Sequence, residues 1–423
     1  MKKTTLITII AIIMTDAASA KFTRNVIFLV LVASLGYFVD IYDLLIFSIV
    51  RKASLIGIGV KAADVLPKGV FIINVQMFGL LLGGILWGVL GDKLGRLKVL
   101  FGSILLYSIA NFANAYVNDV NTYAIVRFIA GIGLAGELGA GITLVSETLS
   151  KEKRGYGTMI VAAVGLFGAV AAVMVAKYGW RDAYKVGGGL GIILLLLRIG
   201  TFESGMFKNI EQAHVSKGNF FMLLNNWQRF KKYLCCILIG VPLWYVVGVL
   251  ITLSPEFGKA LNAKDTLNAG DGILSAYIGI AVGGIIAGLL SQVTRSRKLV
   301  MFIFLILSAI SVIVYLKSTG LTSRYFVLLC FFMGCGVGHW TIFITIAAEQ
   351  FGTNIRATVA TTVPNFVRGS LIPVNIVFVA FKDHYGMITS GYIVMGILTV
   401  IALSSLTQLK ETFGKDLNYL EIS

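Results

Sequence analysis

Residues 88–98 read Gly88-Val89-Leu90-Gly91-Asp92-Lys93-Leu94-Gly95-Arg96-Leu97-Lys98, and they place a cluster of charges between two long apolar runs. The preceding run carries the glycines Gly83 and Gly84, one helical turn before Gly88. Glycines at this spacing let helix backbones approach closely. The stretch therefore predicts a short charged turn between two closely packed apolar helices.

The same pattern returns 200 residues later. Gly283, Gly284 and Gly288 repeat the three glycines in register, and Arg295-Ser296-Arg297-Lys298 follows them. A second match lies near the inner ends of two other apolar runs, where Glu147 precedes Arg154 by seven residues and Glu349 precedes Arg356 by the same number. The chain is therefore expected to consist of two related halves.

Composition decides the class of protein. Of 423 residues, 57% are hydrophobic and 13% are charged, and the mean hydropathy is +0.88. Soluble domains carry about 25% charged residues. The 47 glycines beside 5 prolines suit close helix packing, and the short alternating segments of an outer-membrane barrel are absent. The sequence therefore predicts an all-α membrane protein.

Apolar runs long enough to cross a bilayer number twelve. They cover approximately residues 25–50, 69–90, 97–116, 121–146, 156–177, 185–203, 233–254, 272–292, 298–317, 324–348, 357–380 and 386–409. The long polar insert between the sixth and seventh runs divides the chain. The expected domains are an N-terminal segment 1–24, a six-helix bundle 25–203, a cytoplasmic linker 204–232, a second bundle 233–409 and a tail 410–423.

Basic residues predict the orientation. With both termini cytoplasmic, the inside loops and tails hold 21 Lys and Arg and the outside loops hold 12, while Arg127, Arg198 and Arg368 fall within spans. The basic loop 51–68 is an exception on the outside. Residues 1–20 have the shape of a cleavable signal peptide, and cleavage would reverse the orientation. The whole-chain charge count favours an uncleaved cytoplasmic or interfacial segment.

The remaining composition excludes several functions. The formal charge of +16 comes from loops, where it acts as a topology signal, so no nucleic-acid binding is expected. The cysteines lie within apolar runs without metal or disulfide spacing. No phosphate-binding loop or catalytic constellation is present. The chain is expected to need no cofactor or metal and to be no enzyme.

The residues quoted above support a resemblance to a known family. The Gly88–Lys98 stretch, between the second and third spans, resembles the signature of the major facilitator superfamily. Other segments resemble its sugar-porter and metabolite/proton-symporter branches, namely 127–137, 147–155, 180–181, 203–204 and 411–417. Asp40-Ile41-Tyr42-Asp43 is similar to the paired-aspartate motif of aromatic-acid proton symporters, which has Gly where Ile41 stands. In the second-half loop, Gln292 and Ser296 replace the acid and the arginine.

This resemblance implies the superfamily's fold, with twelve transmembrane helices in two pseudo-symmetric six-helix halves and the substrate site between them near the midplane. It also implies transport by alternating access.

Ionisable residues within spans are the candidate proton-coupling residues. Asp40 and Asp43 share one helix face, and Asp43 is expected at the same depth as Arg127. Two interpretations stay open for these residues: proton uptake by the aspartates, or a fixed ion pair that pins two helices. Glu137 is either a second proton-binding position or a structurally satisfied acid. His339 could titrate, or could be simply hydrogen-bonded.

Arg368 is expected near mid-membrane without an obvious acid in its own half. Either the substrate anion supplies the missing charge or an acid of the first half does. The expected substrate-binding residues are Arg127, Arg368, Tyr37, Gln76, Asn365 and Trp340. The expected gating residues at the cytoplasmic side are Gly88, Asp92, Gly95, Arg96, Glu147, Arg154, Glu349 and Arg356. The superfamily resemblance implies that the pairs Asp92 with Arg96 and Glu147 with Arg154 lock that side.

The sequence therefore predicts a secondary transporter of the bacterial inner membrane, most simply a proton-coupled symporter of a small organic anion that functions as a monomer. Its expected partners are the solute, protons and the lipid bilayer. The alternatives are a sugar or polyol porter, efflux of a drug or metabolite, and a receptor that binds solute without turnover.

Overall fold

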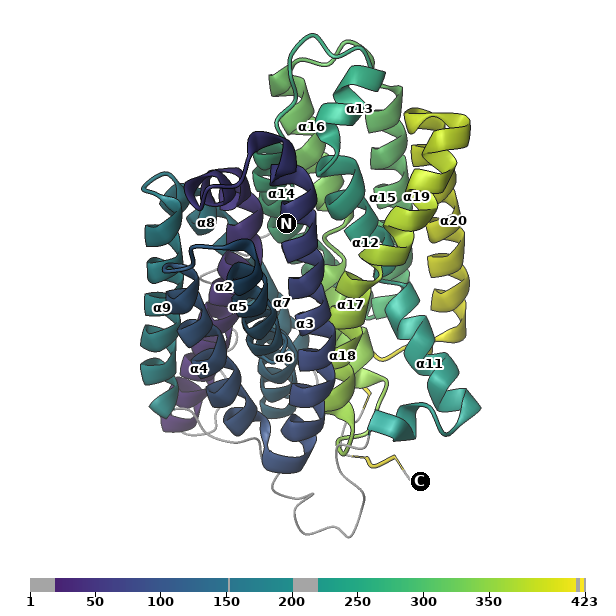
Figure 1. The fold of residues 1–423 in the computed structure, drawn as a ribbon. Helices are drawn as coiled ribbons and strands as arrows, with labels where there is room; N and C mark the ends of the chain where they lie inside the picture. Colours follow the sequence, from purple (N-terminus) through teal and green to yellow (C-terminus); the bar gives the residue numbers. More distant parts are fainter. Residues whose placement is uncertain (1–19, 151–152, 201–219, 416–418, 422–423) are drawn as a thin grey trace.

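The computed structural model describes residues 20–150, 153–200, 220–415 and 419–421. Every regular element in these ranges is helical (Figure 1). The predicted N-terminal segment up to residue 19 and its cleavage site lie outside the described residues, as does the linker from 204 to 219. The expected division into domains stays a prediction.

The described residues of the first half fold into eight helices. They are α2 (Ala20–Gly57), α3 (Val65–Leu94), α4 (Arg96–Asn114), α5 (Val120–Leu134), α6 (Glu137–Thr148), α7 (Arg154–Leu166), α8 (Gly168–Ala176) and α9 (Trp180–Leu197). Short 3₁₀ turns cover Ala62–Asp64 and Arg198–Gly200. The fourth predicted span is α5 with α6, and the fifth is α7 with α8.

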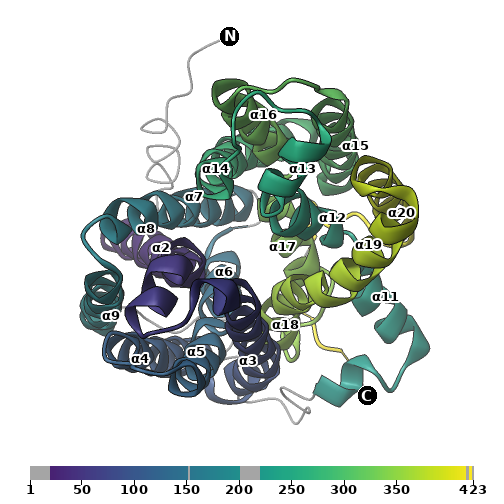
Figure 2. The same cartoon turned by 45° about the horizontal axis from the view of Figure 1, so that its top comes forward.

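The second half begins with a 3₁₀ turn at Phe220–Leu223. Its helices are α11 (Trp227–Leu238), α12 (Val241–Tyr245), a π-helix (Val246–Ile251), α13 (Ser254–Ala260), α14 (Ala269–Thr294), α15 (Arg297–Lys317), α16 (Ser323–Gly336), α17 (Trp340–Glu349), α18 (Arg356–Gly369), α19 (Leu371–Tyr385) and α20 (Met387–Gln408). Viewed from above, α2–α9 and the second-half helices form two neighbouring groups (Figure 2).

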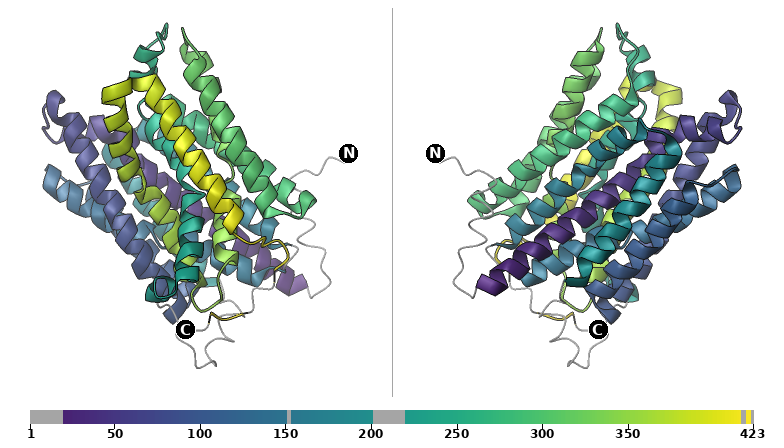
Figure 3. Two further views of the ribbon diagram at one scale, coloured as in Figure 1. Left: turned by 90° about the vertical axis from the view of Figure 1, so that its right-hand side faces the viewer. Right: turned by 90° about the vertical axis from the view of Figure 1, so that its left-hand side faces the viewer.

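All twelve predicted spans are helical in the described residues. Ten helical segments are long and apolar enough to cross a membrane. The sixth predicted span is α9, whose first turns carry Arg181, Asp182 and Lys185. The tenth is broken between α16 and α17. In the side views of Figure 3, the start of α2 and the end of α20 lie toward the same end of the bundle. The side of the membrane that this end faces stays a prediction.

The internal repeat reappears as packing. A Cβ added at Gly83 would lie 2.5 Å from the carbonyl oxygen of Ile132 in α5, and one at Gly283 would meet the carbonyl of Cys335 in α16. The α3–α5 and α14–α16 pairs thus use glycines 200 positions apart for the same close approach. Gly95, after α3, has φ +99°, which glycine adopts without strain, and its counterpart Arg295 has φ +52°. The two halves therefore share a positive φ at this turn as well as a glycine pattern, although ψ differs, at 154° for Gly95 and 32° for Arg295.

The halves meet closely at the end that carries Asp92, Glu147 and Arg356, which is named the inner end here. A Cβ at Gly88 of α3 would lie 2.8 Å from the Cα of Thr358 in α18. Close backbone contact between α3 and α18 therefore requires glycine at position 88.

Replacement of Gly88 by alanine is expected to separate the halves at the inner end, because overpacking of this kind costs about 1–3 kcal/mol. Hydrogen exchange of the amides at the start of α18 should become faster. The control is Gly189→Ala, since a Cβ there meets no atom within 4 Å. Unchanged exchange in Gly88→Ala would contradict the assignment of this contact.

Candidate functional site

A buried ion pair joins two helices of the first half. Arg127 of α5 donates from Nη1 to Asp43 Oδ1 at 3.0 Å and from Nη2 to the backbone oxygen of Asp43 at 3.0 Å. Its Nε donates to Gln76 Oε1 of α3 at 3.3 Å. Both charged side chains have no exposed surface. The equal depth expected from the helical rise is therefore realised as direct contact, in the arrangement of a fixed pair.

Tyrosines extend this network. The guanidinium carbon of Arg127 lies 5.6 Å from the ring centroid of Tyr184 in α9. The hydroxyls of Tyr184 and Tyr123 are 2.6 Å apart, and that of Tyr123 donates to Ser54 Oγ at 3.2 Å. Asp43, Arg127 and these side chains all belong to the first half, so the network fixes its helices relative to one another.

A second ion pair crosses between the halves. Arg368 Nη2 of α18 lies 3.5 Å from Asp40 Oδ2 of α2, and Arg368 Nη1 donates to Asn365 Oδ1 at 3.3 Å. Among the described residues, neither carboxylate oxygen of Asp40 has a hydrogen-bond partner, nor do Arg368 Nε and Nη2. Of the two alternatives left open for Arg368, this conformation has the pair with an acid of the first half.

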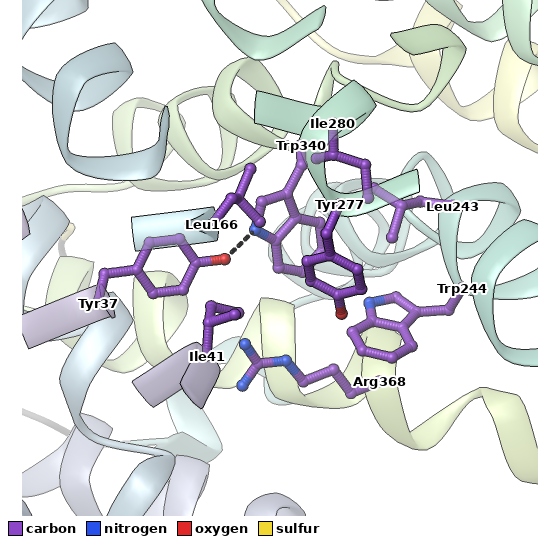
Figure 4. A pocket seen from close by; sticks show the side chains of 9 residues that line it. All are labelled: Tyr37, Ile41, Leu166, Leu243, Trp244, Tyr277, Ile280, Trp340 and Arg368. Atoms are coloured by element: carbon purple, nitrogen blue, oxygen red, sulfur yellow. Dashed lines mark hydrogen bonds between the residues drawn. The ribbon is translucent and has the colours of Figure 1, made fainter. Parts of the chain in front are cut away.

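Arg368 borders a small cavity between the halves (Figure 4). Its other lining residues are apolar or aromatic: Tyr37, Ile41, Leu166, Leu243, Trp244, Tyr277, Ile280 and Trp340. Trp340 Nε1 donates to the Tyr37 hydroxyl at 2.8 Å across the halves. The cavity measures about 10 Å³, room for a single water molecule. The candidate site is therefore closed in this structure.

The predicted substrate-binding residues separate into two places. Arg368, Tyr37 and Trp340 line the cavity, and Asn365 orients Arg368. Arg127 and Gln76 belong to the first-half network instead. Tyr277 was not expected at the site, since an apolar span with a single tyrosine gives no signal.

Glu137 and His339 lie apart from the cavity lining. Glu137, at the start of α6, forms a buried ion pair and hydrogen bond with Arg198. Its Oε2 has no hydrogen-bond partner among the described residues, and its role stays a prediction. His339 lies at the break between α16 and α17, where its Nδ1 is 3.4 Å from the Gly336 oxygen. Its role in proton coupling stays a prediction.

The inner end is held by contacts between the halves. Asp92 accepts hydrogen bonds from the backbone N–H groups of Ala357 at 3.0 Å and Thr358 at 2.8 Å, in the first turn of α18, where the helix dipole favours an anion. Glu147 Oε1 lies 3.1 Å from Arg356 Nη1, with both side chains fully buried or nearly so. Asp92 and Glu147 thus anchor the first half to α18.

These contacts between the halves add to the expected gate, whose own pairs stay a prediction. The sequence predicted that Asp92 pairs with Arg96 and Glu147 with Arg154. The side chains of Arg96 and Arg154 lie outside the described residues, and the contacts described for both acids reach the other half.

Glu349 has a partner in its own half. Arg297 donates from Nε to Glu349 Oε2 at 2.6 Å and from Nη2 to Oε1 at 2.9 Å. The sequence predicted no ion pair of the first-half type for this loop, because Ser296 replaces the arginine. The next residue, Arg297, supplies a bidentate pair instead.

The C-terminal tail, through Glu411, contacts the turn before α15. Glu411 accepts from Ser296 Oγ at 2.6 Å and from the backbone N–H of Arg297 at 3.0 Å. Burial alone would raise the pKa of the Glu411 carboxyl, but these hydrogen bonds together hold it below its ordinary value. The carboxylate therefore acts as a charged cap on the start of α15.

Among the described residues, no group of three His, Cys, Asp or Glu side chains could hold a metal ion.

The sequence of this chain matches that of a known transporter family. The sequence profile of the Major Facilitator Superfamily matches residues 26–372. The chain belongs to this superfamily. It is a multi-pass membrane transporter, and it is not an enzyme. The superfamily prediction is thereby confirmed.

Two curated bacterial relatives and one solved structure are similar over most of the chain. The candidate niacin/nicotinamide transporter NiaP of Bacillus subtilis is 26% identical over 80% of this chain and 84% of its own. The gentisate transporter of Corynebacterium glutamicum is 24% identical over 89% of this chain and 86% of its own. The superfamily's proton:xylose symporter XylE has a similar fold, with a TM-score of 0.72 and 18% identity over 94% and 98% of the two chains. The bacterial relatives agree with the predicted inner-membrane localisation.

A double-mutant cycle on Asp43 and Arg127 is expected to show strong coupling in this superfamily member. Asp43→Leu or Arg127→Met alone should lower the free energy of unfolding by about 3–5 kcal/mol, because each leaves a buried charge unpaired. The double variant should lose much less than the sum of the two single losses. Reversible unfolding in mixed detergent micelles measures the free energy of unfolding of the two single variants and of the double variant.

The control cycle uses the exposed pair Lys185 and Asp182, which are 2.9 Å apart. Exposed pairs contribute little, so no measurable coupling is expected there. Additive losses at Asp43 and Arg127 would contradict the account of a buried structural pair.

Proposed function

We propose that this transporter carries a small organic acid, best a planar aromatic carboxylate, together with a proton. The observation that carries the proposal is the Arg368 guanidinium, which has two unsatisfied donors beside an aromatic cavity between the halves. A carboxylate needs a donor fork of this kind.

Arg368 suits an anion in both charge and shape. Its guanidinium stays charged and offers paired donors that match the two oxygens of a carboxylate. Nε and Nη2 have no hydrogen-bond partner among the described residues. A substrate carboxylate would satisfy both donors and would compensate the buried charge.

The walls of the cavity suit a flat ring. The guanidinium carbon of Arg368 lies 6.0 Å from the ring centroids of both Trp244 and Trp340. These two rings are 6.4 Å apart at an interplanar angle of 74°, an arrangement in which an aromatic substrate can stack on one ring and meet the edge of the other. The relatives named for niacin and gentisate support this class, because both compounds are aromatic acids.

Asp40 provides a route to proton coupling. Asp40 and a substrate carboxylate would compete for the same guanidinium, because Asp40 compensates the charge of Arg368 when no solute is bound. Protonation of Asp40 removes its attraction for Arg368 and frees the fork. Proton and anion therefore bind more favourably together than separately, and this is the thermodynamic requirement for symport.

Binding requires the site to expand. Small-molecule pockets commonly measure about 300 Å³ or more, whereas this cavity measures about 10 Å³. The inner end is closed by the Asp92 and Glu147 contacts. Solute would enter when the opposite end opens and would leave after the inner contacts break.

Replacement of Arg368 by lysine is expected to raise the KM for benzoate or nicotinate uptake by about tenfold or more, because lysine keeps the charge and loses the donor fork. Uptake into proteoliposomes, with binding to the purified protein, measures the effect. Arg324→Lys, at an exposed arginine of α16, is the control and should be unchanged.

Three results would contradict the proposal. An unchanged KM for carboxylate uptake by Arg368→Lys would show that Arg368 does not bind the substrate carboxylate. Uptake of neutral sugars but of no carboxylate would favour the sugar-porter alternative, and binding without counterflow would favour a receptor.

A further inference from the structure

A second, larger cavity lies at the inner end of the second half. Its volume is about 570 Å³, and α11, the turn after α17, the end of α20 and the tail all contribute to it. Figure 1 shows α11 beside the C-terminus at the lower right of the molecule. The transport cycle proposed above uses none of the residues that line this cavity.

The cavity is strongly basic. Its charged lining residues are Arg229, Lys231, Lys232, Lys410, Lys415 and Glu421, so five cations face one carboxylate. Glu421 is already 3.1 Å from Lys232 Nζ. Arg229 Nη1 is buried and has no hydrogen-bond partner among the described residues. Lys232 Nζ also donates to the Gln350 oxygen at 2.9 Å, and Lys415 Nζ donates to the Tyr419 hydroxyl at 2.9 Å. The lining therefore carries more positive charge than its one carboxylate compensates.

The positive charges of this cavity lie close enough to repel one another. Burial lowers the pKa of the Lys415 ammonium, and the nearby Lys232 lowers it further. Lys231 and Lys410 are exposed at the rim of the cavity. An anion that enters would relieve this repulsion.

Exposed aromatic side chains flank the basic cavity. Trp227 is 73% exposed at the start of α11, and Phe221 is 68% exposed just before it. Tryptophan and phenylalanine beside basic residues favour the headgroup level of a bilayer. With the predicted orientation, in which both termini are cytoplasmic, the cavity lies where an anionic lipid of the cytoplasmic leaflet can reach it.

We propose that this basic cavity binds a phosphate group through Arg229, Lys231 and Lys410, and that the headgroup of an anionic phospholipid supplies it. A phosphate offers several acceptor oxygens to such a cluster. Basic pockets between membrane helices on the cytoplasmic side are suited to these headgroups.

The bound phosphate would stabilise the closed inner end. The tail beside the cavity holds the turn before α18: the Thr353 N–H donates to the Tyr419 oxygen at 2.9 Å, and the Glu421 N–H donates to Asn354 Oδ1 at 2.9 Å. Arg356, which pairs with Glu147 across the halves, follows directly. A ligand that bridges α11, α20 and the tail therefore supports the position of Arg356.

The test titrates the purified full-length chain in detergent with short-chain phosphatidylglycerol and follows the thermal unfolding midpoint. Phosphatidylcholine of the same chain length is the neutral lipid, and inorganic phosphate and pyrophosphate at matched ionic strength are the soluble sources. Lys231→Gln/Lys410→Gln removes two cations of the rim. Lys61→Gln/Lys317→Gln removes two exposed lysines far along the sequence from it and is the charge-matched control.

Phosphatidylglycerol is expected to raise the midpoint of the native chain and of the control, while phosphatidylcholine does not. The apparent affinity of Lys231→Gln/Lys410→Gln should fall about thirtyfold, because each basic residue near an anionic headgroup contributes roughly fivefold. The midpoint of each variant without lipid reports its folding.

Stabilisation by pyrophosphate alone, lost in the cavity variant, would overturn the lipid source and keep the phosphate site. Equal responses of the cavity variant and the control, or no response to any phosphate, would overturn the proposal entirely. Lys410→Glu is the second variant if the double variant has a lowered midpoint without lipid.

Discussion

An uncompensated charge inside a bilayer is costly, and this constraint organises the molecule. Five arginines buried in the described residues each contact a carboxylate: Arg127 with Asp43, Arg198 with Glu137, Arg297 with Glu349, Arg356 with Glu147, and Arg368 with Asp40. The first three pairs lie within one half. In the last two, the first half supplies the acid and the second half supplies the arginine. Charge compensation therefore fixes each half internally and also joins the two halves.

The two crossing pairs have different consequences for movement. Arg356 and Glu147 close the inner end, together with the hydrogen bonds from the start of α18 to Asp92. Arg368 and Asp40 join the halves beside the central cavity, and in the proposed cycle a proton and an anion replace this pair without leaving a bare charge. Alternating access needs contacts that exchange partners at a modest net cost. The pairs within each half supply the rigid bodies that move.

The sequence predicted the elements better than their partners. Apolar length and glycine spacing depend on local residues, so the twelve helical spans and the packing repeat were predicted well. Helical rise predicted the equal depth of Asp43 and Arg127, and their fixed ion pair was one of the two interpretations left open. The partners of Glu147 and Arg368 depend on which helices of the two halves face each other, which no local pattern encodes. The break before Trp340 and the early start of α11 at Trp227 were missed because both segments remain apolar or amphipathic throughout.

The central claim is that a proton on Asp40 frees Arg368 for the substrate carboxylate. The most direct measurement is acidification inside proteoliposomes that hold a pH dye, on addition of external benzoate, for the native chain, Asp40→Asn and Asp43→Asn. The account predicts that the native chain moves protons with benzoate, and that Asp40→Asn exchanges benzoate without proton movement. Proton movement by Asp40→Asn at the native rate would contradict it, and its loss in Asp43→Asn alone would move the coupling to the first-half network.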